Sequence, residues 1–310
     1  MEEEKEAGAI ENVLIIAKLT EQTRNMSLKI QEEDAFSSID CVGQCLIDEV
    51  RTKAFEKAIK RVTKPDWTAL DIGTGSGIMA LFAARSGAKN VFAVEYDPCV
   101  ADIARENFVN NGFGDKINLI IGDARDLKFK NNIKFDLVIM EMLTTGMIDE
   151  FQVQAVNNLH KQKVVFDSTV FIPCVQETYI SLAEMNFSMY DFEMKMVKHL
   201  WHGLSENQNY SIKSESKLLN SVSFGSAINE KFNGIITLKI DKSGVVNCVH
   251  ISSKTYLTDK IVIGDTETLN APVVVPIAER HVKKGDELNV HVSYIFGKGF
   301  QNFKAEIIGK

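Results

Sequence analysis

Short apolar runs alternate with segments of helical periodicity along the first half of the chain, from about residue 68 to residue 140. The apolar runs are bounded by turn residues, as buried strands are, and the segments between them are long enough for helices. The predicted strands end at Asp71, Glu95, Ile121 and Met140, and the predicted helices between them cover 77–86 and 97–110. Strands that alternate with helices predict an α/β fold with a Rossmann-like doubly wound sheet, whose strands are mostly parallel.

The pattern changes after residue 173, where β-branched runs follow one another without helices between them. Turn signals such as 241–244 and 283–286 separate these runs. We therefore expect a C-terminal β-barrel or sandwich domain after the α/β core. Its predicted strands are 176–183, 234–240, 245–257, 273–277, 287–296 and 303–308, and the stretch 188–204 is expected to be helical or irregular.

The length of 310 residues exceeds the usual size of one domain, so the chain is expected to hold two. Before the core, residues 5–25 carry apolar positions at helical spacing, and a second helix is predicted over 46–59, ended by the Lys-Pro-Asp stretch at 64–66. The predicted organisation is an N-terminal helical segment at 1–50, a ligand-binding domain at 51–172 and a β domain at 173–310, with a possible dimerisation insertion at 188–217.

A glycine-rich turn joins the first predicted strand of the core to its first helix. After Asp71, glycines stand at alternate positions as Gly73, Gly75 and Gly77, and the helical segment starts at Ile78. Glycine lets the backbone approach a ligand closely, and the N–H groups at a helix start can point toward that ligand. A dinucleotide site would call for the different spacing G-x-G-x-x-G. The alternative is a tight turn that holds no ligand.

Acidic side chains follow the other predicted strands of the core. Glu95 ends the second strand, Asp123 follows the third, and Glu141 follows the fourth. Ligands of doubly wound sheets bind beyond the carboxyl ends of the strands, so we expect one crevice to collect these acids. An acid about 20 positions after a glycine turn, as Glu95 is here, is suited to hold ribose hydroxyls.

Charge and cysteine content narrow the possible partners. The formal net charge of −7 and the pI near 5.5 disfavour a nucleic-acid partner and favour a cationic one. The five cysteines include no C-x-x-C pair and the six histidines show no metal spacing, so no metal site is expected. The sequence contains neither an apolar stretch of membrane-spanning length nor a signal-peptide pattern, so we expect a cytoplasmic protein without a membrane partner.

The glycine turn and Glu95 resemble the first motif of class I S-adenosylmethionine-dependent methyltransferases. Two further stretches extend the resemblance to the protein arginine methyltransferase family. Residues 48–52 read Asp-Glu-Val-Arg-Thr, and Glu141 and Glu150 are nine positions apart, like the two glutamates of that family. The resemblance implies S-adenosyl-L-methionine as the cofactor. It implies that Arg51 holds the methionine carboxylate, Glu95 the ribose and Asp123 the adenine amine, with Asp71, Gly73, Gly75 and Gly77 completing the cofactor site.

Paired carboxylates suit a cationic acceptor. A guanidinium is planar and always charged, so Glu141 and Glu150 together would orient it and stabilise charge on the attacking nitrogen. The alternative makes Glu150 an exposed acid at the start of a helix, where it would suit the helix dipole. The family's Tyr-Phe-x-x-Tyr motif does not stand at 32–36, nor its Thr-His-Trp loop at 269–272. These differences predict weak or no activity on Arg-Gly-rich peptides.

The sequence therefore predicts an arginine-methyltransferase-like enzyme that acts on a cationic peptide or small-molecule nitrogen. One alternative is a small-molecule N- or O-methyltransferase, and an alternative of another class is an inactive cofactor-binding scaffold subunit. The family that the chain resembles dimerises through an arm in the barrel domain. The insertion at 188–204 accordingly implies a homodimer that uses Phe192, Leu200 or Trp201.

Overall fold

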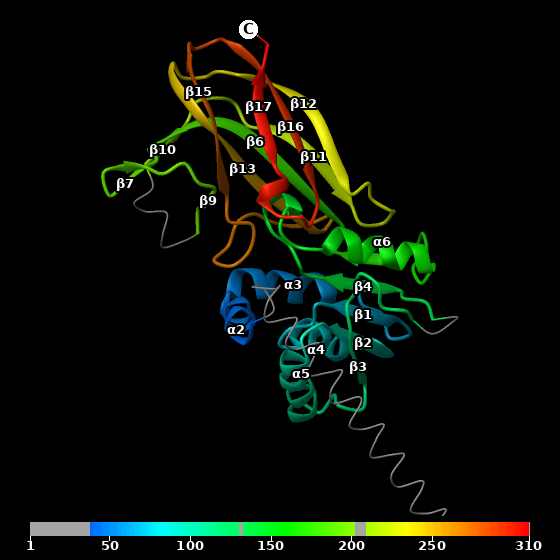
Figure 1. Cartoon of the computed structure of the whole chain (residues 1–310). Coiled ribbons are helices and arrows are strands. Elements are labelled where there is room, and N and C mark those ends of the chain that lie inside the picture. The colour runs from blue at the N-terminus through cyan, green and yellow to red at the C-terminus, as the bar shows by residue number, and fades with distance from the viewer. Residues whose placement is uncertain (1–37, 130–132, 202–208, 310) are drawn as a thin grey trace, which may run out of the picture.

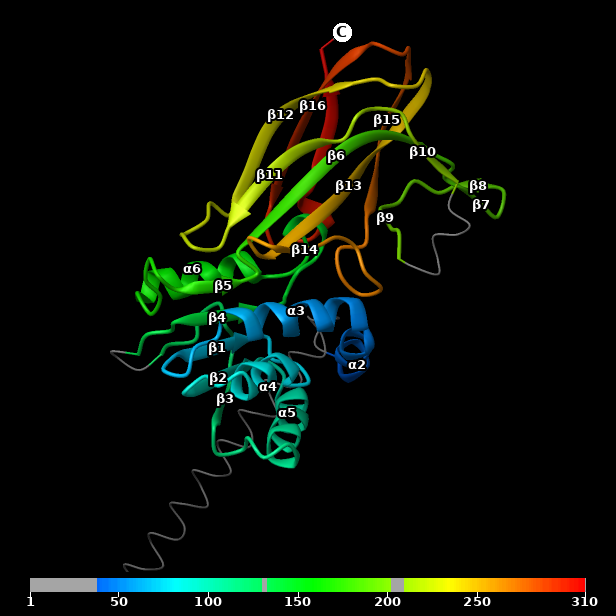
Figure 2. The same ribbon diagram turned by 180° about the vertical axis from the view of Figure 1, so that it is seen from behind.

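The computed structural model describes residues 38–129, 133–201 and 209–309 (Figure 1). The helix predicted at 5–25 and the stretch 32–36 lie outside these residues. The described chain forms an α/β part, residues 38–172, and a β part, residues 173–309, which are stacked on each other (Figures 1 and 2).

The α/β part contains one parallel sheet of five strands in the order β3-β2-β1-β4-β5. The strands are β1 (Thr68–Ile72), β2 (Asn90–Glu95), β3 (Ile117–Ile121), β4 (Leu137–Met140) and β5 (Val170–Ile172). Strand β1 pairs in parallel with both β2 and β4, so the strand order reverses at β1. Doubly wound sheets bind their ligands at such a reversal. The predicted doubly wound sheet is confirmed.

Side-chain caps start three of the five α-helices that are named here. The helices are α2 (Ile39–Ile47), α3 (Glu49–Val62), α4 (Ile78–Arg85), α5 (Pro98–Asn110) and α6 (Gln152–Gln162), with the short turns η1 (Thr145–Met147) and η3 (Phe300–Asn302). As predicted, the Asp97 carboxylate caps α5, accepting the Cys99 N–H at 2.7 Å. The helix predicted over 46–59 and ended by residues 64–66 is observed as α3, which ends at Val62, but residues 46 and 47 belong to α2 instead. Asp48 ends α2 and starts α3, because its carboxylate accepts the Arg51 N–H at 3.1 Å.

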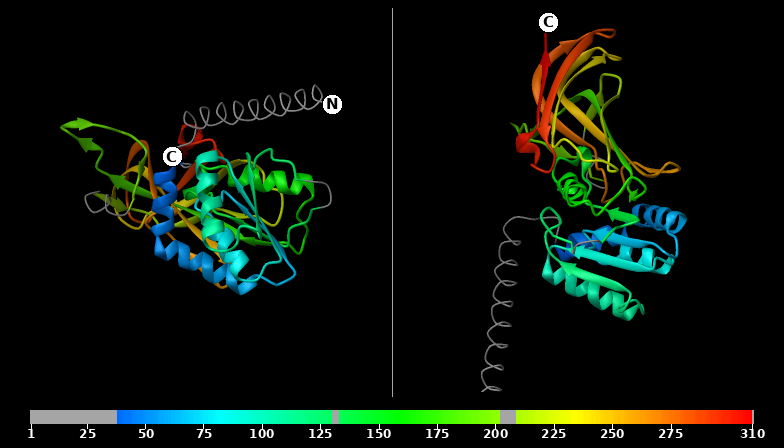
Figure 3. Two further views of the ribbon diagram at one scale, coloured as in Figure 1. Left: turned by 90° about the horizontal axis from the view of Figure 1, so that it is seen from below. Right: turned by 90° about the vertical axis from the view of Figure 1, so that its right-hand side faces the viewer.

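The β part consists mainly of two antiparallel sheets (right-hand view of Figure 3). The larger sheet follows the order β10-β6-β13-β15-β9, with β11 paired to β6 and β14 paired to β13, and the smaller sheet follows β12-β16-β17. The strands are β6 (Val175–Met185), β10 (Tyr210–Ile212), β11 (Lys217–Ser223), β12 (Lys231–Lys239), β13 (Gly244–Thr258), β14 (Ile261–Ile263), β15 (Val273–Val282), β16 (Glu287–Ile295) and β17 (Lys304–Ile308). Buried and more exposed residues alternate along β16, as expected for a strand with one face on the core.

The stretch 188–204 forms short strands where the structure describes it. Strands β7 (Ser188–Met189) and β8 (Phe192–Glu193) pair as a hairpin. Its turn residues Tyr190 and Asp191 have positive φ angles of 54° and 64°, as two-residue hairpin turns do. Strand β9 (Lys198–His199) pairs with β15. A helical reading of this stretch is therefore wrong.

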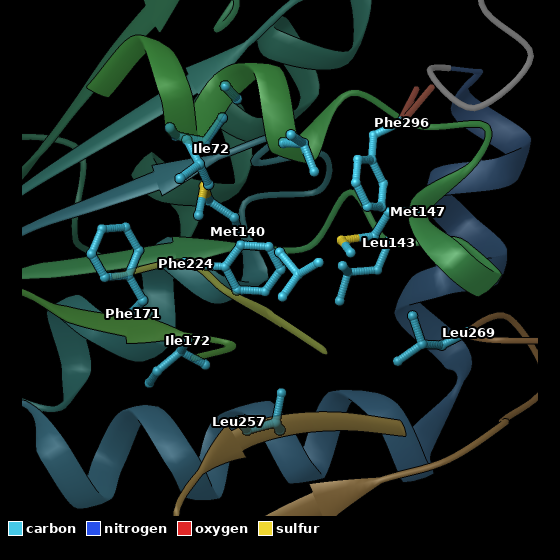
Figure 4. Packing of buried hydrophobic residues seen from close by; sticks show 14 of the residues in the cluster. Ile72, Met140, Leu143, Met147, Phe171, Ile172, Phe224, Leu257, Leu269 and Phe296 are labelled. Atoms are coloured by element: carbon cyan, nitrogen blue, oxygen red, sulfur yellow. The ribbon is translucent and has the colours of Figure 1, made fainter. Parts of the chain in front are cut away.

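The loop between β4 and α6 lies between the α/β part and the β part. Thr145 Oγ1 in this loop donates to the main-chain oxygen of Ala271 at 2.7 Å. Figure 4 shows Leu143 and Met147 of the same loop beside Phe296, within a core cluster that includes side chains of both parts. The β part thus fixes the backbone that follows β4.

Within residues 38–129, 133–201 and 209–309, no helix has both the length and the apolar character needed to cross a membrane.

Candidate active site

A cavity of about 390 Å³ lies at the carboxyl ends of β1, β2 and β4 and is bounded by α2 and by the loop between β14 and β15. This volume lies within the range of small-molecule sites, about 300–1,000 Å³. The predicted site residues that line it are Arg51, Gly73, Gly75, Glu95, Asp123, Glu141 and Glu150, whereas Asp71 and Gly77 do not. One cavity therefore brings together the glycine turn and the acids that follow the strands.

Gly73 and Gly75 allow two segments to pack onto the glycine turn. Their φ angles are positive, 70° and 53°. A Cβ atom on Gly73 would lie 2.8 Å from Met142 Cγ, and one on Gly75 would lie 3.3 Å from Val42 Cγ1 of α2. A larger residue would displace the loop after β4 or helix α2, so both walls of the cavity depend on these glycines.

Asp71 and Gly77 support the turn from outside the cavity lining. A Cβ atom on Gly77 would overlap the ring of Phe108, so this glycine permits α4 to pack on α5. The Asp71 carboxylate accepts the Thr74 hydroxyl at 2.6 Å and the Ala80 N–H at 3.1 Å. Burial raises the pKa of Asp71 to about 7. Both residues therefore brace the glycine turn from behind the residues that line the cavity.

Glu95 ends β2 and holds the glycine turn in place. Its carboxylate accepts the N–H groups of Gly75 at 2.8 Å, Tyr96 at 2.8 Å and Asp97 at 3.0 Å. Burial raises the pKa of Glu95, although these hydrogen bonds act in the opposite direction. A carboxylate has about four lone-pair sites, so Glu95 can also accept a hydroxyl group of a ligand in the cavity.

Asp123 follows β3 and is paired within its own turn. Arg125 Nε donates to both carboxylate oxygens, at 2.9 and 2.8 Å, and Nη2 donates at 2.6 Å. Partial burial raises the pKa of Asp123, but the contacts with Arg125 outweigh it and hold this pKa below its ordinary value. Arg125 itself also lines the cavity and was not among the predicted residues. Arg125 therefore neutralises the charge of Asp123, the acid predicted at this position.

Arg51 lies in the first turn of α3 and is a buried cation. Its guanidinium pairs with Glu141, and its Nη1 donates to the main-chain oxygen of Cys45 at 2.7 Å. The side chain is 8% exposed, and its Nε–H has no hydrogen-bond partner among the described residues. A buried donor without a partner is costly, and a ligand carboxylate would satisfy it. Arg51 therefore fits a cofactor that carries a carboxylate.

Three acids of the loop between β4 and α6 line the cavity, namely Glu141, Asp149 and Glu150. Glu141 pairs with Arg51, and the charge of Glu150 also acts on Arg51, so the predicted carboxylate pair lies beside a permanent cation. Asp149 was not predicted. Its carboxyl accepts the Phe300 N–H, and burial raises the pKa of Asp149 to about 6. Only its place beside Glu150 in the sequence could have indicated it.

The β part contributes an aromatic wall made of His199 and Trp201. Both line the cavity, and their rings stack at 5.7 Å between centroids with an interplanar angle of 11°. Phe300 contacts His199 edge-on at 5.4 Å, and burial lowers the pKa of His199. Of the predicted dimer-contact residues, Trp201 lines the cavity and Leu200 is buried. No local pattern indicates this wall, because β9 reaches the cavity only by pairing with β15.

Helix α2 closes another side of the cavity with Cys41 and Cys45. The five cysteines are free thiols. Among the described residues, no group of three or more side chains is arranged to hold a metal ion. The groups at hand for chemistry in this cavity include carboxylates, guanidinium groups, thiols, hydroxyls and aromatic rings.

Comparisons with known proteins agree with this architecture. The family model of ribosomal protein L11 methyltransferase (PrmA) matches residues 51–207. An uncharacterized protein of Methanocaldococcus jannaschii is 33% identical over 262 residues, which cover 84% of this chain and 94% of that protein. A probable protein arginine N-methyltransferase 1.2 of Arabidopsis thaliana is 29% identical over 177 residues, 53% of this chain and 48% of that protein.

A solved structure shares the fold. It is the Trypanosoma brucei PRMT1 enzyme-prozyme heterotetrameric complex with AdoHcy, in which one chain matches with a TM-score of 0.69 and 18% sequence identity. The match covers 84% of this chain and 89% of that chain, and so includes both the α/β part and the β part.

Proposed function

The chain belongs to the ribosomal protein L11 methyltransferase (PrmA) family of S-adenosylmethionine-dependent methyltransferases, and from this premise we propose that it is an arginine-methyltransferase-like enzyme that methylates a cationic nitrogen. The acceptor is protein arginine or a related cationic group on a peptide or small molecule. One observation carries the proposal. Glu141 and Glu150, from the two ends of one loop, line the same cavity as the glycine turn.

The proposed cofactor site uses the residues along the carboxyl ends of β1 and β2. Arg51 would hold the cofactor carboxylate through its Nε–H, which has no hydrogen-bond partner among the residues that the structure describes. Gly73 and Gly75 would admit the cofactor to the backbone, and Glu95 would accept its ribose hydroxyls. Asp123 would accept the adenine amine while it keeps its contact with Arg125. Bound S-adenosylmethionine supplies an electrophilic methyl group on a sulfonium centre.

The proposed acceptor site is the acidic end of the cavity. Glu141 and Glu150 would accept hydrogen bonds from the acceptor and direct its attacking nitrogen at the methyl carbon. As the N–C bond forms, positive charge develops on that nitrogen, and the fixed carboxylates stabilise it. The aromatic wall of His199 and Trp201 would cover the apolar part of the acceptor.

Two alternative functions each have support. A small-molecule N- or O-methyltransferase is favoured by a cavity of about 390 Å³, which suits a compact ligand. An inactive cofactor-binding subunit is favoured by the ion pair between Arg51 and Glu141, which occupies one of the two proposed acceptor carboxylates.

We also infer a homodimer that forms through the hairpin of β7 and β8. Apolar side chains are exposed on and just after this hairpin, and a cluster of this kind on one surface is typical of protein interfaces. Phe192, the one predicted contact residue that is exposed, is 69% accessible. The exposed residues are Met189, Tyr190, Phe192, Met194 and Met196.

The same proposal assigns the cofactor to the predicted domain 51–172 and the acceptor wall to the predicted domain 173–310. It places the protein in the cytoplasm, where its five free thiols would stay reduced.

Two measurements test the proposed function. Calorimetric titration is expected to show micromolar binding of S-adenosylhomocysteine and no binding of NAD. Methyl transfer from labelled S-adenosylmethionine is then followed with an Arg-Gly-rich peptide, small cationic amines and guanidines, and neutral alcohols. Label is expected on a cationic amine or guanidine and is expected to be lost in Glu150→Gln. Label only on neutral acceptors would favour the small-molecule alternative, and cofactor binding without any turnover would favour the inactive subunit.

A further inference from the structure

We propose that Asp149 accepts the proton that the acceptor nitrogen loses during methyl transfer, and that the acceptor is therefore an ammonium or guanidinium group that enters with its proton. This inference rests on the proposed function. It assigns a base that is not one of the two predicted glutamates.

Asp149 is held at the acceptor end of the cavity by contacts on both sides. Its N–H donates to Thr144 Oγ1 at 3.3 Å, and its carboxyl accepts the N–H of Phe300. The preceding residue, Ile148, accepts the Gly299 N–H at its main-chain oxygen at 2.8 Å, which ties the loop to the β part. The Asp149 carboxyl is therefore fixed on the cavity wall close to the aromatic wall.

Charge pairing distinguishes Asp149 from Glu141. Glu141 pairs with Arg51, and a permanent cation weakens a carboxylate as a base because it stabilises the ionised form. Asp149 forms no ion pair within the part of the chain that the structure describes. Burial raises the pKa of Asp149 to about 6, so at pH 7 the group is mostly ionised and is more basic than an ordinary aspartate.

The atoms and electrons of the step balance with this assignment. A protonated acceptor first loses an N–H proton, which exposes the nitrogen lone pair, and the Asp149 carboxylate becomes a neutral carboxylic acid. The lone pair forms the N–C bond to the methyl carbon while the S–C bond breaks and its electron pair stays on sulfur. Asp149 then releases its proton to solvent. Glu141 and Glu150 keep their charge throughout and hold the acceptor.

A purely structural role for Asp149 would be that of an acid before the N-terminus of α6. The helix dipole would lower the pKa of such an acid, whereas burial raises it here. The exposed Glu267 offers a matched control, because it is a carboxylate on the cavity wall that the proposed function does not use. The titratable groups that share the cavity with Asp149 are Cys41, Cys45, Arg51, Glu95, Tyr96, Asp123, Arg125, Glu141, Glu150, His199 and Glu267.

Sinefungin tests the assignment without an identified acceptor, because it carries an amino group where S-adenosylmethionine carries its sulfonium methyl. Calorimetry gives the ratio of the dissociation constants of S-adenosylhomocysteine and sinefungin between pH 5 and pH 8. In the wild type and in Glu267→Gln, sinefungin is expected to bind about tenfold more tightly than S-adenosylhomocysteine at pH 7.5. This advantage should decrease as the pH falls through about 6, the pKa of Asp149. Asp149→Asn should lose both the pH dependence and most of the advantage.

The outcomes separate this inference from the proposed function. A ratio that does not vary with pH in the wild type would overturn the role of Asp149 while leaving the proposed function intact, and so would an Asp149→Asn ratio equal to that of the wild type. No binding of S-adenosylhomocysteine to the wild type would overturn both. Binding of S-adenosylhomocysteine by Asp149→Asn shows that the variant folds. If it does not bind, Asp149→Ser replaces it, and the wild-type pH profile decides by itself.

Discussion

Replacing Glu141 by glutamine removes the partner of a buried guanidinium. The side chains of Arg51 and Glu141 are 8% and 11% exposed, so water can solvate neither charge well. Breaking a buried ion pair by removing one partner costs about 3–5 kcal/mol. The introduced amide would keep one hydrogen-bond acceptor and Arg51 keeps its contact with the Cys45 carbonyl, so we expect the lower end, about 3 kcal/mol. At about 2–4 °C per kcal/mol, the Tm should fall by about 6–12 °C.

The same substitution should leave cofactor binding intact or strengthen it. In the wild type, Arg51 would divide its hydrogen bonds between Glu141 and the cofactor carboxylate. Without Glu141, the ligand carboxylate becomes the counter-ion of Arg51, so the affinity for S-adenosylhomocysteine should be equal or up to about tenfold higher. The ligand should therefore raise the Tm of Glu141→Gln more than that of the wild type. The kcat should fall by about a hundredfold or more, as expected on removal of one charge-stabilising group.

Thermal unfolding with and without S-adenosylhomocysteine, together with calorimetric titration, measures these effects. Glu267→Gln is the control, because it removes one exposed cavity carboxylate and should change stability by less than about 0.5 kcal/mol. A Tm for Glu141→Gln within about 2 °C of the wild type would show that Arg51 does not depend on this partner. A tenfold loss of ligand affinity would show that Glu141 contacts the cofactor, and either result would refute the reasoning.

Four further substitutions test other parts of the site and the proposed dimer contact. Gly75→Val should abolish S-adenosylhomocysteine binding by calorimetry, because φ is 53° and an added Cβ already lies 3.3 Å from Val42; retained micromolar binding would contradict this. Burial raises the pKa of Asp149 in the folded protein to about 6, above its ordinary value of about 4 in the unfolded chain. Protonated Asp149 therefore favours the folded state, and this contribution to the free energy of unfolding is complete below about pH 4 and is lost as the pH rises through 6. Asp149→Asn should thus be more stable than the wild type in urea at pH 8, by about 1 kcal/mol after allowance for partial exposure, with no difference near pH 4. Trp201→Ala should raise the acceptor KM about fivefold or more without changing the affinity for S-adenosylhomocysteine. If the acceptor KM rises and the affinity for S-adenosylhomocysteine falls by the same factor, Trp201 has only a structural role. Phe192→Asp should convert a dimer into a monomer by light scattering at tens of micromolar protein, and a monomeric wild type would reject the dimer.

The elements that could be predicted are those with start and stop signals in the local sequence. The bounds of α5 agree with the prediction because Asp97 and Pro98 start it, while Asn111 caps its end and Gly112 follows with a positive φ of 77°. The glycine turn and Glu95 were recognisable for the same reason. They are neighbours in one strand–turn–helix–strand unit, and the Gly75 N–H donates to Glu95 at 2.8 Å.

The features that could not be predicted depend on contacts between distant residues. Asp48 divides the predicted helix at 46–59 in part because its carboxylate also accepts the N–H and the hydroxyl of Thr268, at 3.0 and 2.9 Å. Trp201 reaches the cavity because His199 is opposite Val273 in a sheet. Met and aromatic residues spaced as in 189–201 are compatible with a helix or with strands, so the partner strand decides.

The positions of Glu141 and Glu150 depend both on local sequence spacing and on contacts with distant residues. Nine residues of spacing place Glu141 and Glu150 at the two ends of one loop, but the path of that loop is set by the β part. Gly146 has a φ of 70°, and its N–H donates at 2.9 Å to Ser253 Oγ, which is 107 residues away in the sequence. A change around Ser253 would shift Glu150 relative to Glu141 and leave Glu95 and the glycine turn in place. Proteins that share the glycine turn and Glu95 could therefore differ in acceptor without any change in the residues that we propose bind the methyl donor.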